Sequence, residues 1–246
     1  MIALGRRRFR PRLWPTLVTL AALAGLVALG TWQVQRLHWK EALIAELDAR
    51  MRAPPAALPA EIADPAALEY RPVRLVGRFL HGKELYLGAR AREGRVGFHV
   101  VTPMELEDGR VVLVDRGWVP PERKAPATRT EGQVAGRVTL VGLPRRGGWK
   151  GLDLFRPDNQ PERNLWLWMD LPAMAARAGL SGVVTELYVE AGPAPNPGGL
   201  PIGGQMRVEL RNDHLQYAMT WYALAVALLV IYVLHQSPVQ AEREER

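Results

Sequence analysis

Two long apolar runs, one near each end of the chain, constrain the fold most strongly. The first begins at Leu13, directly after a basic leader, and the second begins just after Asp213 and continues to about Leu234. Neither run contains Asp, Glu, Lys or Arg, and each is close to the ~20 apolar residues that a helix needs to cross a bilayer core. The sequence therefore predicts two membrane-spanning helices that hold the polar middle of the chain on one side of a bilayer.

The distribution of charge predicts the orientation of these helices. Five arginines lie within residues 6–12, just before the first apolar run, and basic residues flank the cytoplasmic ends of membrane helices. We therefore expect both termini in the cytoplasm and the middle of the chain in the periplasm, or in the mitochondrial intermembrane space. A cleaved signal peptide is the alternative for the first run, but Trp32, Gln33 and Arg36 stand where a small-residue cleavage site is expected.

Composition excludes several classes of function. The 246 residues carry a net charge of +7, but much of this excess lies in the leader and follows from topology. The absence of cysteine excludes disulfides, thiol redox chemistry, a CxxC copper site and covalent haem attachment. With two serines and no HExxH motif the usual hydrolase sites are missing, so we do not expect an enzyme. No basic stripe is interleaved with aromatic residues, so we expect no nucleic-acid partner.

The middle of the chain reads as a β-rich domain. Short alternating segments predict strands over 70–80, 84–89, 96–106, 110–119, 132–143, 185–189 and 205–210, and residues 170–178 predict one amphipathic helix. Hairpin turns between short strands favour an antiparallel, barrel-like sheet with one or two helices, so the fold class is membrane α+β. The predicted organisation is a leader (1–12), a first span (13–35), a helical extension and Pro-rich linker (36–69), a periplasmic domain (70–212), a second span (213–235) and a cytoplasmic tail (236–246).

One face at the start of the second span carries the best candidate site. On a helix His214, Tyr217, Ala218 and Trp221 follow a spacing of i, i+3, i+4 and i+7 and share a face near the membrane boundary. Such a histidine is either a functional group or, with its aromatic neighbours, an interfacial anchor. A neutral imidazole there can be an axial haem ligand, and the indole of Trp221 can pack on the macrocycle.

Basic residues are expected at the same membrane level. Arg36, Lys40 and Arg211 can pair with haem propionates if a haem binds there. The other histidines, at 38, 81, 99 and 235, have no metal-ligand spacing, so we expect no multi-histidine metal site. Asp115 stands next to Arg116 and is interpreted as one half of a structural ion pair.

Six segments spread along the chain carry a family resemblance. They are GTWQVQRLHWK (30–40), GRFLHGKELYLG (77–88), VVTPMEL (100–106), VDRGWVP (114–120), PERNLWLWMDLPAM (161–174) and GGLPIGGQMRVELRNDHLQYAMTWYALA (198–225). In these segments and their order the sequence resembles the surfeit locus protein family of cytochrome c oxidase assembly factors. The two-span topology deduced from the apolar runs is also that family's topology.

The resemblance implies a function. Members help to build haem-copper oxidases around the insertion or retention of haem a, and bacterial members look like haem a-binding proteins. The histidine and tryptophan that matter there correspond to His214 and Trp221 in this sequence. The resemblance thus implies a bacterial inner-membrane protein that binds haem a non-covalently. From their places at the same membrane level we expect Tyr217, Arg36 and Arg211 beside these two residues. It also implies as partners the oxidase catalytic subunit, other assembly factors, membrane lipid and an enzyme of haem a synthesis.

Two alternatives remain open. In the first the protein is a haem-free scaffold, the helices are only anchors, and loops around Trp149, Trp166 and Trp168 contact an oxidase subunit. These tryptophans can equally be core residues. In the second the protein itself synthesises haem a, which a single intramembrane histidine candidate and only two spans make less favourable.

Overall fold

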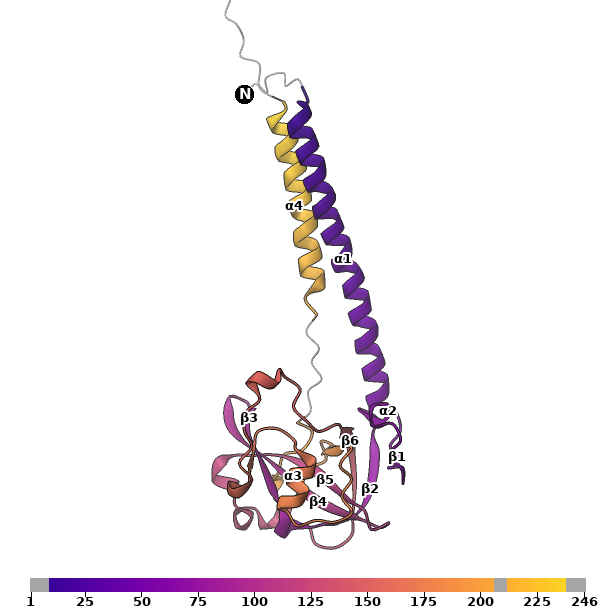
Figure 1. Cartoon of the computed structure of the whole chain (residues 1–246), viewed down its shortest axis with the longest axis vertical. Helices are drawn as coiled ribbons and strands as arrows, with labels where there is room; N and C mark the ends of the chain where they lie inside the picture. The colour runs from indigo at the N-terminus through magenta and orange to yellow at the C-terminus, as the bar shows by residue number, and fades with distance from the viewer. Residues whose placement is uncertain (1–8, 206–211, 238–246) are drawn as a thin grey trace, which may run out of the picture. The chain divides into compact units, whose positions relative to one another are not determined.

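A computed structural model describes residues 9–205 and 212–237, and the chain divides into two compact units (Figure 1). One unit contains the two ends of the chain, up to Glu46 and from Glu209, and the other is Leu47–Val208. The first unit is a pair of long helices and the second is a β domain.

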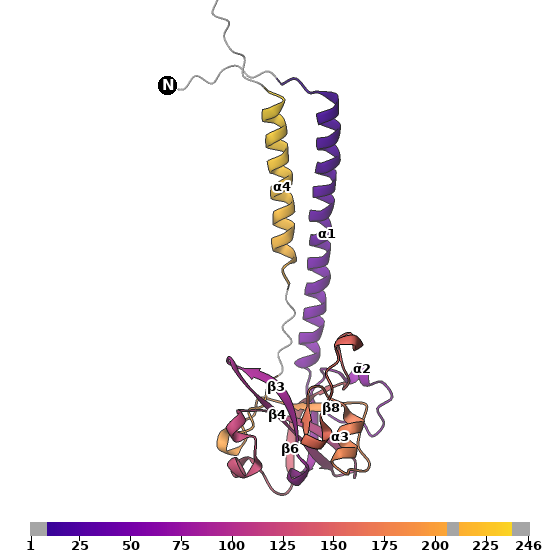
Figure 2. The same cartoon turned by 60° about the vertical axis from the view of Figure 1, so that its left-hand side comes forward.

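Two helices form the first unit. They are α1 (Leu13–Met51), with 39 residues, and α4 (His214–His235), with 22 residues. Both are long and apolar enough to cross a membrane, as judged by length and composition. Figure 2 shows them side by side along the apolar run of α1. Helix α1 continues without a break beyond this run, as the sequence predicts for residues 36–50.

Small residues allow the two helices to approach closely. Ala218 and Ala225 of α4 are 2% and 5% exposed, and Gly30 of α1 is buried as well. The ring of Tyr222 lies directly on Gly30, because a Cβ atom added there would come within 2.7 Å of the tyrosine Cε1. Close backbone contact through small residues is a common way for membrane helices to pair.

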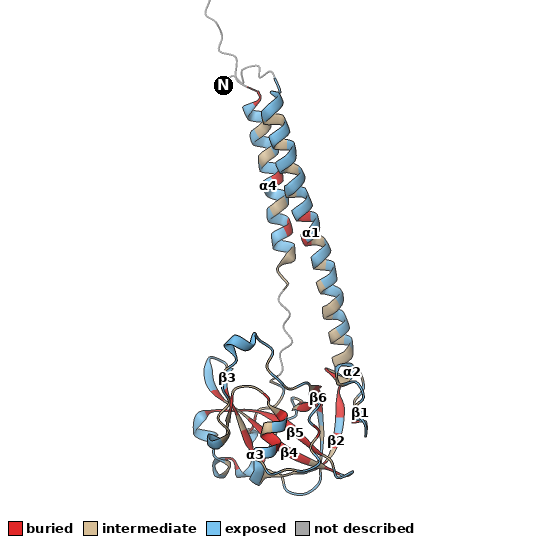
Figure 3. Ribbon diagram, in the orientation of Figure 1, coloured by how far each residue is buried: buried red, intermediate tan, exposed pale blue. Residues whose placement is uncertain are grey.

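Hydrogen bonds between side chains join the same helices. The hydroxyl groups of Thr16 and Tyr232 are 2.6 Å apart, and those of Thr31 and Tyr222 are 3.2 Å apart. The outward faces of both helices are largely exposed (Figure 3) and carry large apolar side chains, as expected for surfaces that contact lipid.

The β domain contains one mixed sheet and few helices. Its strands are β1 (Ala56–Ala57), β2 (Val73–Phe79), β3 (Leu85–Arg92), β4 (Arg95–Leu106), β5 (Val111–Val119), β6 (Val138–Arg145), β7 (Leu165–Trp166) and β8 (Tyr188–Ala191). Its α-helices are α2 (Pro65–Leu68) and α3 (Leu171–Arg177). The β-rich domain between two apolar helices, with few helices of its own, confirms this part of the predicted fold class.

The strand pairings close a ring. The order is β1-β2-β6-β8-β5-β4-β3-β7, and β2 also pairs with β4, so β2, β6, β8, β5 and β4 each have two neighbours within the ring. Four of its five pairings are antiparallel, and the pairing of β5 with β8 is parallel. This parallel pairing, with those of β1 with β2 and β3 with β7 outside the ring, departs from the predicted antiparallel sheet. The barrel-like shape stays a prediction.

Several predicted elements are confirmed and others differ at their ends. Helix α3 begins after Asp170, whose side chain accepts a hydrogen bond from the Ala173 amide at 3.2 Å. Strand β6 begins at Val138 instead of Gly132, because Gly132 ends a 3₁₀ turn and packs against the carbonyl oxygen of Leu200. The strand expected over 205–210 lies almost entirely outside the described residues.

The Pro-rich segment before the sheet contributes to the domain. Strand β1 pairs with β2, and Leu58 is only 8% exposed within a core cluster. Asp64 caps α2 by accepting hydrogen bonds from the amides of Ala66 and Ala67. The segment predicted as a linker therefore packs against the sheet.

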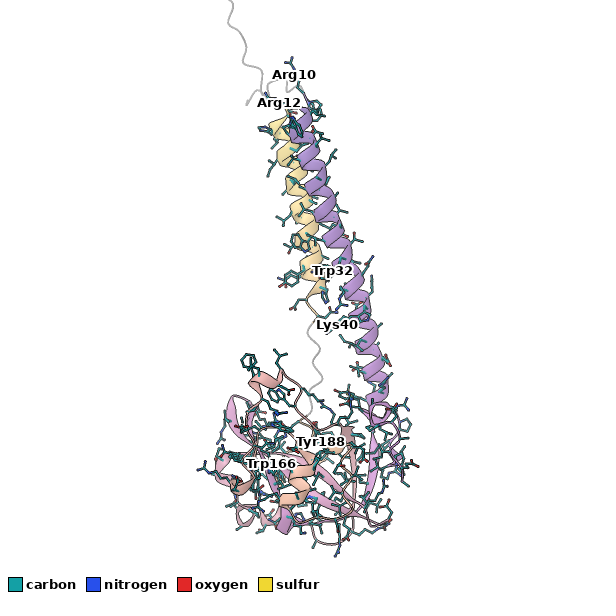
Figure 4. All side chains as sticks on the ribbon, in the orientation of Figure 1. Arg10, Arg12, Trp32, Lys40, Trp166 and Tyr188 are labelled. Atoms are coloured by element: carbon teal, nitrogen blue, oxygen red, sulfur yellow. The ribbon has the colours of Figure 1, made fainter. Side chains whose placement is uncertain are left out.

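Two apolar clusters cover opposite faces of the central strand. Along β5, Val112 and Val114 belong to one cluster and Leu113 to the other, as expected from the alternation of side chains in a strand. All nine residues of β5 are buried. The second cluster includes α3 and Trp166, which is fully buried (Figure 4), so Trp166 is a core residue and not part of a contact surface.

A buried carboxylate joins distant segments of the domain. Glu84 accepts hydrogen bonds from both terminal nitrogens of Arg129, and an Arg116 nitrogen lies 3.9 Å from the same carboxylate. All three side chains are at most 2% exposed. Burial, opposed by the charge of Glu84, lowers the pKa of Arg116 to about 10. Arg116 also donates hydrogen bonds to the Gly132 carbonyl and to Asn196.

We expect Arg129→Ala to destabilise the β domain far more than Arg78→Ala. The first substitution leaves Glu84 buried without its main partner, which costs about 3–5 kcal/mol. The second removes an exposed pair between Arg78 and Glu105, worth less than about 1 kcal/mol. Thermal unfolding of the full-length protein in detergent, followed by near-ultraviolet circular dichroism, measures both. Equal losses would contradict the role assigned to Glu84.

Candidate functional site

The start of α4 holds a histidine fixed by a partner on α1. His214 Nδ1 lies 2.7 Å from Gln33 Oε1, and Gln33 is only 9% exposed. An amide oxygen can only accept a hydrogen bond, so Nδ1 carries the proton. In the neutral imidazole the lone pair is then on Nε2. This arrangement orients the ring and prepares Nε2 as a metal ligand.

Trp221 lies two turns after His214 on the same face of α4. This face also contains Ala218 and Ala225, which are buried against α1. Between the imidazole and the half-buried indole this face carries the buried Ala218 and the exposed Tyr217, and the two rings together offer one ligand atom and one flat aromatic surface.

The other predicted site residues have different positions. Tyr217 is 55% exposed and lies outside the buried stripe of α4. Arg36 is exposed, and its guanidinium lies 4.2 Å from the ring centroid of Trp39. Figure 4 places Trp32 and Lys40 on the same helix, α1. Arg211 lies outside the described residues, so the structure brings together only part of the predicted set.

Gln33 is the residue that sequence reasoning did not select. Gln33 is an uncharged polar residue in an apolar segment, three positions after Gly30. A buried amide in such a segment needs a hydrogen-bonding partner, and this requirement could have indicated a partner on the second span.

A separate group of charged residues lies in the β domain. His99 Nδ1 donates a hydrogen bond to Asp115 at 2.8 Å, which corrects the expected pair of Asp115 and Arg116. Neighbours in a strand point to opposite faces, so Arg116 faces Glu84 while Asp115 faces His99. Close by, Tyr188 and Arg145 donate hydrogen bonds to Glu190 at 3.0 and 3.3 Å.

This group lines a cavity of about 520 Å³. Burial and the nearby Asp115 carboxylate raise the pKa of Glu190. Burial also raises the pKa of Tyr188. The hydrogen bonds of the group form two sets, one between His99 and Asp115 and one that joins Tyr188 and Arg145 to Glu190. Among the described residues no set of three or more His, Cys, Asp or Glu side chains is arranged to hold a metal ion.

The described parts of the chain define a class: a β domain carried by two apolar helices, with an oriented histidine between these helices. The chain belongs to the SURF1 family, whose family model matches residues 20–226. This membership confirms the resemblance deduced from the sequence.

Relatives from animals and a choanoflagellate match most of the chain. Surfeit locus protein 1 of Rattus norvegicus is 46% identical over 214 residues, which cover 81% of this chain and 68% of the relative. Surfeit locus protein 1 of Homo sapiens is 46% identical over 215 residues, covering 81% and 70%. The SURF1-like protein of Monosiga brevicollis is 41% identical over 216 residues, covering 83% and 81%.

Two carboxylates of the β domain, the buried Glu69 and the partly buried Glu190, should respond to pH in opposite directions. Although burial works against the change, hydrogen bonds and charge from Arg146 and Lys150 lower the pKa of Glu69 from 4.5. Its contribution to stability is therefore present at neutral pH and is lost as the pH falls below this value. The pKa of Glu190 is raised, so the effect is opposite. The contribution of Glu190 to stability is lost as the pH rises above 4.5.

We therefore expect Glu69→Gln to reduce the loss of stability towards acidic pH and Glu190→Gln to reduce the loss on going from acidic to neutral pH. The midpoint of thermal unfolding is measured for wild type and each variant of the full-length protein over a pH series, and its slope against pH tests both expectations. A change of slope in the same direction for the two variants would contradict these assignments.

Proposed function

We propose that this chain is a non-enzymatic assembly factor for haem-copper cytochrome c oxidase and that it holds haem a for the catalytic subunit. One observation carries the proposal: the hydrogen bond between Gln33 and His214, which directs the imidazole lone pair to Nε2. The family resemblance supplies the identity of the cargo and of the oxidase.

The residues at the start of α4 fit the chemistry of a haem. A haem iron can be held by a neutral imidazole, and His214 would hold it through Nε2. Trp221 supplies an aromatic surface, and we assign Tyr217, Arg36 and Arg211 to the edge of the ring and its propionates. Because the chain has no cysteine, thioether attachment is impossible, and a non-covalently held haem can be passed on.

The proposed location follows from the two apolar helices. We infer a protein that spans the bacterial inner membrane twice, with both termini in the cytoplasm and the β domain, closed as a small barrel, in the periplasm. The histidine would then lie at the periplasmic boundary of the second span. From there the cargo can pass between an enzyme of haem a synthesis, other assembly factors and the catalytic subunit.

The experiment is a visible spectrum of the detergent-purified protein after co-expression with haem a synthesis enzymes. We expect wild type to carry a haem a spectrum and His214→Ala to lose or shift it. His235→Ala is the matched control, because it changes an exposed histidine at the other end of the same helix, and its spectrum should equal that of wild type.

Two outcomes would count against the proposal. Equal spectra for wild type and His214→Ala would remove His214 as the ligand. A folded wild-type protein without haem would favour the haem-free scaffold, which should still co-purify with oxidase subunits.

Gln33→Leu tests the orientation of the imidazole. Loss of the partner that fixes a metal-bound histidine lowers affinity by about 10–100-fold, and we expect a weakening of this order in titrations of the purified protein with haem. Gln35→Leu, an exposed position on the same helix, is the control and should bind like wild type. Equal affinity in both variants would show that Gln33 does not act on the ligand.

A further inference from the structure

The loop between β6 and β7 carries an exposed apolar tip. Leu152, Leu154 and Phe155 are 72%, 87% and 71% exposed. In the described part of the β domain the other exposed large apolar side chains are Val96 (63%) and Val141 (41%), which are less exposed and lie on separate strands. Neighbouring exposed apolar side chains mark a surface that contacts a partner or a membrane.

The tip is an ordered structure. The indole of Trp149 donates a hydrogen bond to the Leu152 carbonyl at 3.0 Å, and Gly151 packs directly on the same ring. Residues Asp153–Phe155 then form a 3₁₀ turn, closed by a hydrogen bond from the Phe155 amide to the Leu152 carbonyl at 3.0 Å. The backbone is therefore held in place while the apolar side chains point outward.

The base of the loop is attached to the domain. The indole of Trp168 donates a hydrogen bond to the Pro157 carbonyl at 3.1 Å. Asn159 Oδ1 accepts hydrogen bonds from the amides of Leu167 and Trp168 at 2.7 and 3.3 Å. Because the base is held in this way, the tip can insert into a membrane while the loop keeps its structure.

Basic side chains lie before and after the tip in the same loop. Arg146, Lys150 and Arg156 are each about half exposed, with Glu69 and Asp153 as their acidic neighbours. An apolar tip with flanking tryptophans and basic side chains is typical of segments that lie in the interface of an anionic bilayer. The aromatic rings and basic side chains suit the headgroup level, and the leucines and phenylalanine suit the region below it.

The covalent chain ties this side of the domain to a membrane helix. Gln205 lines the same cavity as Trp149, Lys150 and Trp168, and eight residues separate it from His214, the first residue of α4. A chain of this length reaches at most about 30 Å. The link from the domain to the second apolar helix is therefore short.

We propose that Leu152, Leu154 and Phe155 insert into the interface of the anionic bilayer that α1 and α4 cross. The insertion adds a third membrane contact to the protein, provided by the β domain. It does not depend on haem binding, so its failure leaves the proposed function untouched.

The test uses the absence of cysteine from the chain. Full-length Leu154→Cys and Val96→Cys each receive one nitroxide spin label, and each protein is placed in nanodiscs of phosphatidylcholine and phosphatidylglycerol. Val96 is the matched control, because it is an apolar position of the same domain that is also more than half exposed. Relaxation of the label by oxygen and by a water-soluble nickel complex reports its depth.

We expect the label at position 154 to be relaxed by oxygen and protected from nickel, whereas the label at position 96 is relaxed by nickel. Equal nickel relaxation at both positions would overturn the proposal. Protection of position 154 from both reagents would overturn it as well, because this result indicates contact with protein. A Phe155→Cys label should repeat the result at position 154.

Discussion

The close approach of α1 and α4 at Gly30 determines the geometry of the helix pair. With no Cβ at this position, the ring of Tyr222 lies directly on the backbone of α1. One turn further along α1, Gln33 comes within hydrogen-bonding distance of His214. A larger residue at position 30 would separate the helices at the place where His214 needs Gln33. The close packing of Tyr222 on Gly30 is therefore a condition for the hydrogen bond of the histidine.

The β domain depends on a different interaction, the buried carboxylate of Glu84. Removing charges from water is costly, yet this one residue contacts Arg129, about 45 residues further along the chain, and Arg116, about 30 residues further along. A buried ionic group of this kind adds little net stability compared with apolar packing, but it penalises arrangements in which the segments do not meet.

The elements that could be predicted are those governed by local rules. The two spans follow from charge-free runs of bilayer length. Helix α3 follows from the cap at Asp170 before it and from Gly179 after it. The shared face of His214 and Trp221 follows from helical periodicity. The burial of Trp166 and the pairing of Arg129 with Glu84 could not be predicted, because they join residues far apart in sequence. The partner of Asp115 is an intermediate case, since alternation along a strand already separates it from Arg116.

The position of β8 has a consequence for the order in which the domain can be completed. This strand lies between β6 and β5, and it pairs Val189 with Val114, 75 residues earlier in the chain. Until residues 188–191 have been synthesised, β5 lacks one neighbour and the ring of strands has a gap. Contacts of such large sequence separation form slowly and leave strand edges open meanwhile. Closure of the domain is therefore a late event of biosynthesis, completed only about 20 residues before the second apolar helix follows.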